Sequence, residues 1–277
     1  MSELRHTCLA LLRLADPHEK ALKVQNLGQG WTLDINAVWS EPESLPGRPA
    51  RPELLPHTAI KPARLNTREG HAALLHAVCH IEKNAVDLAL DVIWRFAGMP
   101  EDFYRDWWRV AQEEALHFTL LRDHLRSLGF DYGDFPAHTG LWDMAERTRH
   151  DVLARVALVP RTLEARGLDA SPAVKTKLVS IGDHRAGEIL DIILRDEIGH
   201  VAVGNRWYGW LCAQRGLDPV ATYPELTQRY EAPRLKGPFN MAARVQAGFS
   251  QEELQQLQDL TLLPTTLPVN PAASVAH

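Results

Sequence analysis

The chain contains 277 residues, 45% of them hydrophobic, and has a formal net charge of −5 at pH 7. This length is sufficient for one large hydrophobic core or for two domains. The acidic balance, with a pI near 6.2, gives no general attraction to nucleic acid, although local basic clusters leave such a partner open. The three cysteines are far apart and odd in number, which excludes a disulfide framework or a zinc ribbon.

The N-terminal sequence predicts a cytoplasmic protein without a membrane partner. The apolar run Cys8–Ala15 is interrupted by Arg13 and is too short to cross a bilayer. Glu3 precedes this run, where a signal peptide would carry positive charge. We therefore expect neither a membrane span nor a secretion signal.

Residues 1–65 are expected to form a helix and a proline-rich arm rather than a domain. The short helix is predicted over about 2–14. Six prolines with little periodicity lie between residues 40 and 65, so that stretch should run extended over the surface.

Amphipathic stretches between residues 66 and 216 predict an all-α four-helix bundle. The first helix should begin near Asn66, which has Glu69 three residues further on, in the manner of a capping box. A very short link follows that helix, so the first two helices should pack antiparallel. The connection 129–140 has 12 residues and could reach roughly 40 Å, enough for a crossover from one end of the bundle to the other. The predicted helices cover about 66–98, 101–128, 141–166 and 184–215.

Prolines interrupt the second half of the predicted bundle. Pro160 removes a backbone hydrogen bond inside the third helix and should kink it. Ser171 and Pro172 resemble an N-cap followed by proline at the first helical position, and Gly182 would close the small extra helix that they begin.

Residues 217–277 are expected to form an extension that packs on the bundle. Prolines recur in this part, and only about 250–260 has a helical pattern. The stretch Leu235–Asn240 has the glycine, proline and aromatic content of an ordered loop that could act as a lid. The end of the chain, 263–277, should be loose.

Two strings inside the predicted helices repeat one pattern, a glutamate with a histidine three residues later. They are Glu114-Ala-Leu-His117 and Glu197-Ile-Gly-His200. Residues three apart lie about 300° round a helix and about 4.5 Å along it, so both side chains leave the same face. Each string could therefore hold one metal ion.

Each string is preceded, at nearly the same distance, by another glutamate. Glu82 lies 32 residues before Glu114, and Glu164 lies 33 residues before Glu197. Helical counting places Glu82, Glu114 and Glu197 on apolar faces. Glu164 also has apolar neighbours, but its stretch ends soon after it at Gly167, so the identity of the fourth carboxylate stays open. An ionised carboxylate is unfavourable in an apolar stripe unless it is paired or bound to metal, so the set predicts a shared cation site.

Simpler explanations exist for each part of the pattern. Either string alone could be a buried glutamate hydrogen-bonded to its histidine. Glu188 lies nine residues before Glu197, about 180° round the helix, and should face solvent. Other acidic side chains expected to be solvated are Glu113, Asp123 and Glu146. The histidines expected at the surface or just outside the ligands are His76, His80, His124, His150 and His184.

Four carboxylates and two histidines suit two iron ions, or one manganese and one iron. With two divalent ions the site is nearly neutral, and its oxygen-rich ligands disfavour zinc. Carboxylates can change between terminal and bridging modes as iron changes oxidation state. We predict that Glu82 and Glu164 are terminal ligands and that Glu114 and Glu197 bridge the ions. The predicted ligands are Glu82, Glu114, His117, Glu164, Glu197 and His200.

At these residues the chain resembles the ferritin-like superfamily of di-iron carboxylate proteins. More narrowly, it resembles a bacterial ferritin-like family with a domain of unknown function, over about residues 5–260. The resemblance implies that Asp196 orients a ligand histidine, and we place Tyr208 near the ligands as well. A distant similarity exists to the di-iron hydroxylase that modifies a prenylated adenosine in tRNA. The strings that carry the resemblance to the bacterial family are His80-Ile-Glu82, Val159-Pro-Arg-Thr-Leu-Glu164-Ala-Arg-Gly-Leu-Asp169, Asp196-Glu-Ile-Gly-His200, Gly204-Asn-Arg-Trp207 and Leu235-Lys-Gly-Pro-Phe-Asn240.

Together these features predict a ferritin-like four-helix bundle whose di-iron or Mn/Fe centre activates dioxygen to hydroxylate or oxidise an unidentified substrate. Its partners would be dioxygen, an electron donor and a small molecule or nucleoside. The sequence leaves the oligomeric state undetermined, and a homodimer is one option. Two other classes of function also stay open. One is a non-catalytic iron-binding or ferroxidase-like protein, and the other is a ferritin-like scaffold that binds a partner protein.

Overall fold

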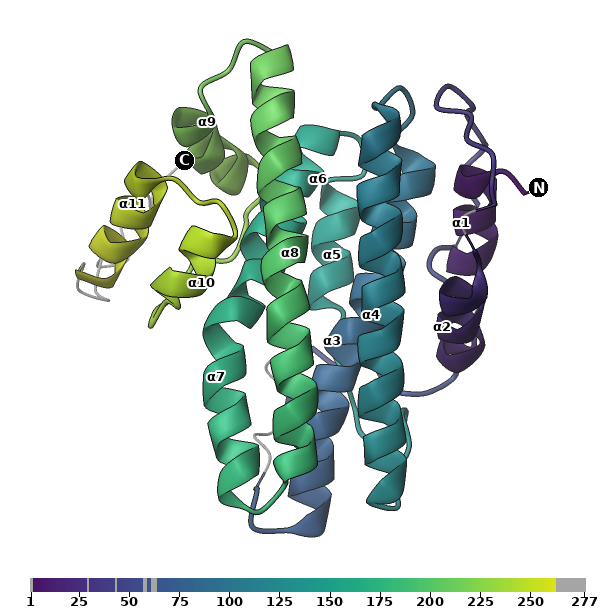
Figure 1. Cartoon of the computed structure of the whole chain (residues 1–277), viewed down its shortest axis with the longest axis vertical. Coiled ribbons are helices and arrows are strands. Elements are labelled where there is room, and N and C mark those ends of the chain that lie inside the picture. The colour runs from purple at the N-terminus through teal and green to yellow at the C-terminus, as the bar shows by residue number, and fades with distance from the viewer. Residues whose placement is uncertain (1, 29, 43, 57–58, 61–63, 263–277) are drawn as a thin grey trace, which may run out of the picture.

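The computed structural model describes residues 2–28, 30–42, 44–56, 59–60 and 64–262. Within them all regular structure is helical, and β-pairing is limited to two isolated bridges, Glu3 with Thr32 and Leu54 with Ala137. Long helices lie side by side along the molecule, and shorter ones cover its sides (Figure 1). None of the helices in these ranges is long and apolar enough to cross a membrane. The prediction of an all-α fold is confirmed.

Two long antiparallel helices form one half of the core. Helix α3 spans Arg68–Arg95 and α4 spans Glu101–Ser127, close to the predicted ranges, and the two pack together over most of their length. The cap of α3 lies one residue later than predicted: the hydroxyl of Thr67, not Asn66, accepts the Gly70 N–H at 3.0 Å.

Helix α8, His184–Gln214, matches the predicted fourth helix and packs against α4. Its N-cap Asp183 accepts the N–H of Ala186 at 2.9 Å. The same carboxylate accepts from His71 Nε2 at 2.5 Å and from His124 Nε2 at 2.9 Å. These histidines come from the start of α3 and the end of α4, so Asp183 joins three helix ends at one end of the molecule (Figure 1).

The predicted third helix, 141–166, is wrong as a single element. The chain instead forms two short helices, a π-helical segment and one longer helix that packs against α8. The connection 129–140 does not carry the chain across the whole molecule, because near its end the His138 carbonyl accepts a hydrogen bond from His80, in the middle part of α3. These elements are α5 (Gly140–Arg147), α6 (Val152–Leu158), η2 (Val159–Glu164) and α7 (Ala165–Ser180).

The predicted small helix beginning at Ser171 and Pro172 is also wrong, because both residues lie inside α7. A proline inside a helix leaves the carbonyl four residues earlier without its usual partner. Here that carbonyl belongs to Leu168, and it accepts a hydrogen bond from Asn240 Nδ2 at 3.1 Å. A residue 72 positions away therefore stabilises the interruption, and the stretch that contains it packs on α7.

Both ends of the described chain are more helical than predicted. Helix α1 matches the predicted N-terminal helix and packs on α3, whereas the sequence prediction missed α2, which packs on α4. After residue 216 the expectation of one helix is wrong, since α9 and α10 precede α11. The predicted loose end, 263–277, lies outside the described residues. The bounds are α1 (Leu4–Leu12), α2 (Pro17–Asn26), α9 (Pro219–Arg229), α10 (Met241–Gln246) and α11 (Gln251–Leu262).

Candidate metal centre

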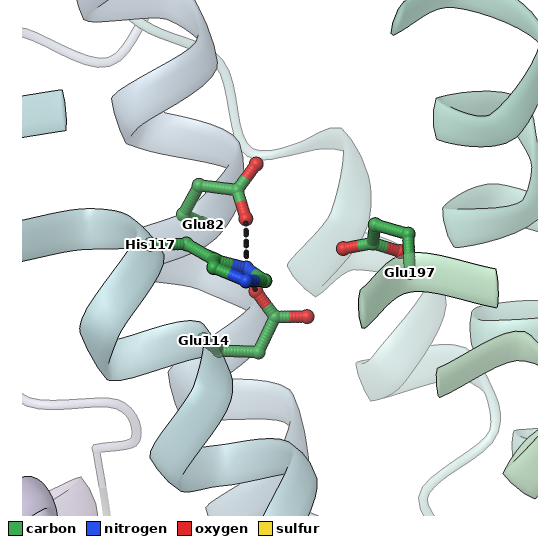
Figure 2. Close-up of side chains that lie close together, drawn as sticks. All are labelled: Glu82, Glu114, His117 and Glu197. Carbon is green, nitrogen blue, oxygen red and sulfur yellow. Dashed lines mark ion pairs between the residues drawn. The ribbon is translucent and has the colours of Figure 1, made fainter. Parts of the chain in front are cut away.

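Three glutamates and one histidine converge between α3, α4 and α8. Each offers one ligand atom, and these atoms all lie within 4.8 Å of one another. Figure 2 shows Glu82, Glu114 and His117 grouped together, with the Glu197 carboxylate directed toward them from α8. All four side chains are buried, and Glu114 and His117 are completely inaccessible.

His117 presents one ring nitrogen to the carboxylates and the other to an aspartate. Its Nδ1 lies 3.3 Å from Glu82 Oε2 and 3.4 Å from Glu114 Oε2. Its Nε2–H donates to Asp196 Oδ2 at 3.1 Å, and Arg195 holds the same carboxylate from the other side. A histidine that donates from Nε2 keeps the Nδ1 lone pair for a cation.

His200 repeats this arrangement from the other side of the cluster. Its Nδ1 lies 2.9 Å from Glu114 Oε1 and 3.6 Å from Glu197 Oε1. Its Nε2–H donates to Glu113 Oε2 at 2.8 Å. The two rings lie 5.8 Å apart, centroid to centroid, so Glu114 faces both histidines, one through each of its oxygens.

The expectation that Glu113 is merely solvated is wrong. Its side chain is 36% exposed, yet its carboxylate holds the ligand-facing histidine of α8. Glu113 directly precedes the first string, as Asp196 directly precedes the second. That shared position indicates a common role for Glu113 and Asp196, but the sequence-based prediction included Asp196 alone.

Glu164 lies at the end of η2, beside this cluster but outside the group of four. Its side chain is buried, and its Oε2 has no hydrogen-bond partner among the described residues. Burial raises the pKa of Glu164 well above its usual value, and the negative charges of Glu197 and Glu114 raise it further. The Glu164 side chain therefore lies close enough to both carboxylates for their charges to shift its pKa.

The polar atoms of the cluster are buried without hydrogen-bond partners in the described part of the chain. Buried polar groups in folded proteins are otherwise almost always satisfied. Even the 2.9 Å approach of Glu114 to His200 lacks hydrogen-bond geometry, which leaves both atoms unsatisfied. Metal ions would satisfy them all. The atoms are Glu82 Oε2, both Glu114 oxygens, His117 Nδ1, Glu164 Oε2, Glu197 Oε2 and His200 Nδ1.

The pKa values of the cluster reflect its excess of negative charge. Burial, followed by the charge of Glu114, raises the pKa of Glu82 to about 7. Burial by itself lowers the pKa of His117, but Asp196 and the nearby glutamates outweigh it and raise that pKa well above the ordinary value. Crowded carboxylates that favour protonation, beside histidines that favour charge, form a set that nearby cations would stabilise.

Tyr208 lies away from the cluster. It follows His200 by eight residues, which is about 12 Å along the helix axis. Its hydroxyl donates to the carbonyl of Pro219 at 2.6 Å, and its ring faces the Arg161 guanidinium at 4.6 Å. The structure thus uses this tyrosine to join α8 to α9 and η2.

The π-helical segment that ends in Glu164 is held by side chains from α8 and the C-terminal helices. The buried Arg161 donates to Asn205 Oδ1 at 2.9 Å and forms an ion pair with Glu253. Thr162 donates to the Ala157 carbonyl at 2.7 Å, five residues back, as a π turn allows. The C-terminal extension therefore fixes the backbone that presents Glu164.

Close packing of η2 on α8 depends on a glycine. A Cβ at Gly204 would lie 2.9 Å from Pro160 Cβ, closer than two side chains tolerate. Because a glycine at position 204 leaves room for Pro160, η2 can pack closely on α8, and the Glu164 side chain stays near that helix.

Comparison with known proteins shows that most of the chain matches one family. Residues 13–255 match the family described as "Protein of unknown function (DUF455)". A relative from Haemophilus influenzae (strain ATCC 51907 / DSM 11121 / KW20 / Rd), named "Uncharacterized protein", is 45% identical over 263 residues, which cover 90% of this chain and 91% of the relative. No solved structure gives a significant match. With a family match and a relative that both extend over most of its length, this chain belongs to the DUF455 family.

Proposed function

We propose that this chain is a ferritin-like four-helix bundle protein that holds two iron ions, or one manganese and one iron, and uses dioxygen to hydroxylate or oxidise a small molecule or nucleoside. The observation that carries the proposal is the pairing of the two histidines around Glu114. Each presents Nδ1 to the cluster, and each has Nε2 fixed by a carboxylate.

The distances support a division of the ligands between two ions. His117 and Glu82, 3.3 Å apart, would hold one ion. His200 would hold the other, together with Glu164, whose pKa is raised by burial and lowered by the nearby His200. Glu114 lies between both histidines and would bridge the ions. Glu197 belongs to the group around His117 and also lies 3.6 Å from His200 Nδ1, which suits a second bridge.

Charge supports the same assignment. Four carboxylates balance two divalent ions, so a filled site would be neutral in a region that excludes bulk water. The bound ions would supply the electrons and the binding position for dioxygen. An external electron donor would then replace those electrons. The chain itself contributes orientation: Asp196 and Glu113 fix the imidazole rings, and η2 holds Glu164 in place.

Metal loading and molecular size test this function against iron storage. We expect the aerobically purified protein to hold about two iron or manganese ions per chain. We also expect it to remain a small oligomer on size-exclusion chromatography and, after reduction, to consume oxygen. A large shell that mineralises many irons per chain would contradict oxygenase chemistry. A folded protein that takes up no transition metal would contradict the proposal as a whole.

The carboxylates that hold the two histidines, Asp196 and Glu113, give a second test of the metal centre. Asp196→Asn should weaken metal affinity roughly tenfold to a hundredfold, because the ring of His117 loses its charged acceptor. Glu113→Gln should do the same through His200. Metal titration monitored by competition with a chelator measures both effects, and thermal melts of the metal-free proteins report whether the fold is kept.

Asp191→Asn is the matched control, since Asp191 lies on the same helix as Asp196 and is exposed, and its ion-pair partner among the described residues is Lys175. Its affinity should equal that of the wild type. If Asp196→Asn and Asp191→Asn bind metal equally well, the aspartate behind His117 has no role in the centre.

A further inference from the structure

A second group of buried charges lies on a different side of α3. Asp87 is completely buried and is contacted by two ammonium groups. Lys83 Nζ donates to Asp87 Oδ2 at 2.7 Å, and Lys20 Nζ forms an ion pair with Oδ1. Both lysine side chains are at most 7% exposed. Two positive charges therefore share one negative charge away from bulk water.

The surroundings of Lys20 do not correct this imbalance. Among the described residues, its other hydrogen bond goes to the Leu12 carbonyl at 3.2 Å, which carries no net charge. Burial lowers the pKa of Lys20, and the opposing attraction of Asp87 does not fully restore it. The positive charge of the group is thus only partly compensated within the described chain.

This group is separate from the candidate metal centre. Lys83 lies about 100° round α3 from Glu82, and Asp87 lies about 140° round from it. These side chains face the N-terminal helices and the connection before α5, whereas Glu82 faces α4 and α8. An additional ligand at Lys83 would therefore not share a cavity with the iron ligands.

Lys83 lines a pocket that opens between α3, the N-terminal arm and the connection before α5. The cavity measures about 20 Å³. Arg48 also lines it and brings a second positive charge, while Asn84 and Thr139 add polar groups. No carboxylate occurs among the described residues of its lining. Trp142 forms part of the wall.

His80, another lining residue, is fixed in a neutral form. Its Nε2–H donates to the His138 carbonyl at 2.9 Å, and its Nδ1 accepts from the Tyr132 hydroxyl at 2.8 Å. The ring therefore adds no positive charge of its own, and it ties α3 to the connection that forms one wall. The pocket is thus held in shape by hydrogen bonds independent of any ligand.

We propose that this pocket binds a small oxyanion, the phosphate or carboxylate group of an anionic molecule, with Lys83 as its principal charge partner and Arg48 as the second. An anion here would balance the surplus positive charge of the Lys20–Asp87–Lys83 group. The enclosed space is little larger than one water molecule needs, so it would receive one or two oxygen atoms of such a group, with the rest of the anion at the mouth of the pocket. Lysine and arginine are the usual partners of phosphate and carboxylate.

Inorganic phosphate and acetate, each compared with chloride at equal ionic strength, test the proposal and distinguish the two sources of the anion. Calorimetric titration of the metal-loaded wild-type protein should show saturable binding of at least one of them. Lys83→Met should weaken that binding at least tenfold. Lys23→Met is the control, because Lys23 is exposed, and it should leave the binding unchanged.

Stability without the ligand gives a second readout. Lys83→Met leaves Lys20 and Asp87 as a balanced pair, so in chloride its melting temperature should equal or exceed that of the wild type. Added anion should raise the melting temperature of the wild type but not that of the variant. A purely structural ion pair predicts the opposite, a variant that melts lower with and without phosphate, and that result would overturn the proposal.

Binding of phosphate to iron would be recognised by its dependence on the metal ligands. If the anion binds at the pocket, Glu114→Ala should keep the affinity that Lys83→Met loses. Affinity that is lost in Glu114→Ala and kept in Lys83→Met would locate the anion on the metal. Absence of saturable binding by either anion would equally overturn the inference, while leaving the proposed metal centre unaffected.

Discussion

Replacing Glu114 with alanine is expected to reduce the metal content from about two ions per chain to fewer than one. Glu114 faces His117 through one oxygen, at 3.4 Å, and His200 through the other, at 2.9 Å. Neither oxygen has a hydrogen-bond partner among the described residues. Its removal would therefore take a ligand from both halves of the proposed centre at once.

Elemental analysis after aerobic purification and after reconstitution measures this effect. Glu101→Ala is the matched control on the same helix, because Glu101 is exposed and, in the described part of the chain, pairs with Arg105 at the surface. The metal-free Glu114→Ala protein should melt no lower than the metal-free wild type, since it loses one of several crowded buried carboxylates. Wild-type metal content in the Glu114→Ala/Glu197→Ala double variant would rule out this cluster as a metal site.

The convergence of the two halves was predictable because it depends on periodicity. Glu82, Glu114 and Glu197 lie in long helices with clear apolar faces, and in such helices a residue number specifies both a direction and a height. The short link between α3 and α4 then places Glu82 and Glu114 at one level. Three carboxylates and His117 meet in the structure for these reasons.

The segment that carries Glu164 was not predictable in the same way. Pro160 indicated an interruption, but the interruption is a π turn that continues directly into α7 rather than a helix end. Its stability depends on partners distant in sequence, including Arg161 with Glu253 and the Leu168 carbonyl with Asn240. Local patterns in the sequence contain no information about such partners.

Glu113 was missed for a related reason. Its position on the helix is partly exposed, as counting predicts, and exposure by itself indicates a solvated side chain. Its role becomes visible only when α8 brings His200 within 2.8 Å. The comparison with Asp196 shows that residues next to a ligand string are informative even when they lie off the buried face.

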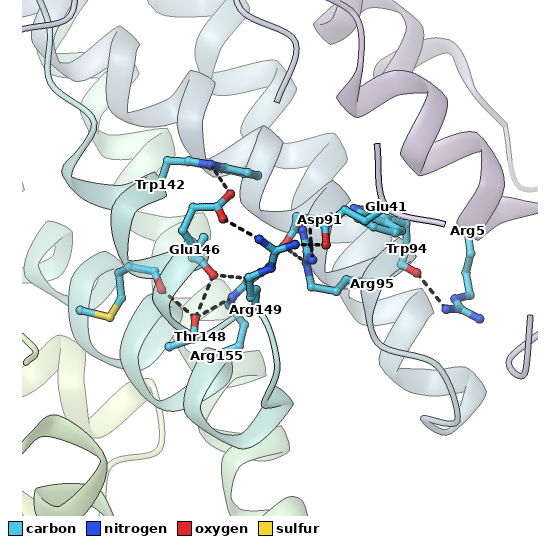
Figure 3. A network of polar contacts seen from close by, with 12 residues as sticks. Arg5, Glu41, Asp91, Trp94, Arg95, Trp142, Glu146, Thr148, Arg149 and Arg155 are labelled. Carbon is cyan, nitrogen blue, oxygen red and sulfur yellow. Dashed lines mark hydrogen bonds and ion pairs between the residues drawn. The ribbon is translucent and has the colours of Figure 1, made fainter. Parts of the chain in front are cut away.

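A separate network of buried charges joins α3 to the segment that precedes η2 (Figure 3). Asp91 accepts from Arg95 Nη2 at 2.8 Å and from Trp94 Nε1 at 3.1 Å, and it forms an ion pair with Arg155. Asp91 and Arg155 are both completely buried. Arg155 also donates to Thr148 Oγ1 at 3.0 Å. The network thus anchors α6, and with it the start of the segment that leads to Glu164.

Asp91→Ala is expected to lower the free energy of unfolding by about 3–5 kcal/mol, because it leaves the Arg155 guanidinium buried without a counter-charge. For a chain of this size that corresponds to a fall of roughly 10 °C in melting temperature. Burial raises the pKa of Asp91, but Arg155 and Arg95 outweigh burial and hold it below the ordinary value. A lowered pKa contributes stability above the unfolded pKa of about 3.9, so denaturant unfolding at pH 7 measures the whole contribution.

Two further variants separate charge burial from general damage. Asp102→Ala removes an exposed carboxylate that pairs with Arg206 at 3.5 Å, and it should change stability by at most about 1 kcal/mol. Replacing both buried partners, in Asp91→Ala/Arg155→Met, should recover part of the stability lost in Asp91→Ala, because the Arg155 guanidinium no longer lies in the core without a counter-charge. Arg95, whose side chain is 8% exposed, keeps its ion pair with Glu41 at 3.0 Å. If Asp91→Ala were no more destabilising than Asp102→Ala, the buried pair would not anchor α6, and the position of η2 would have to depend on its contacts with α8 and the C-terminal helices alone.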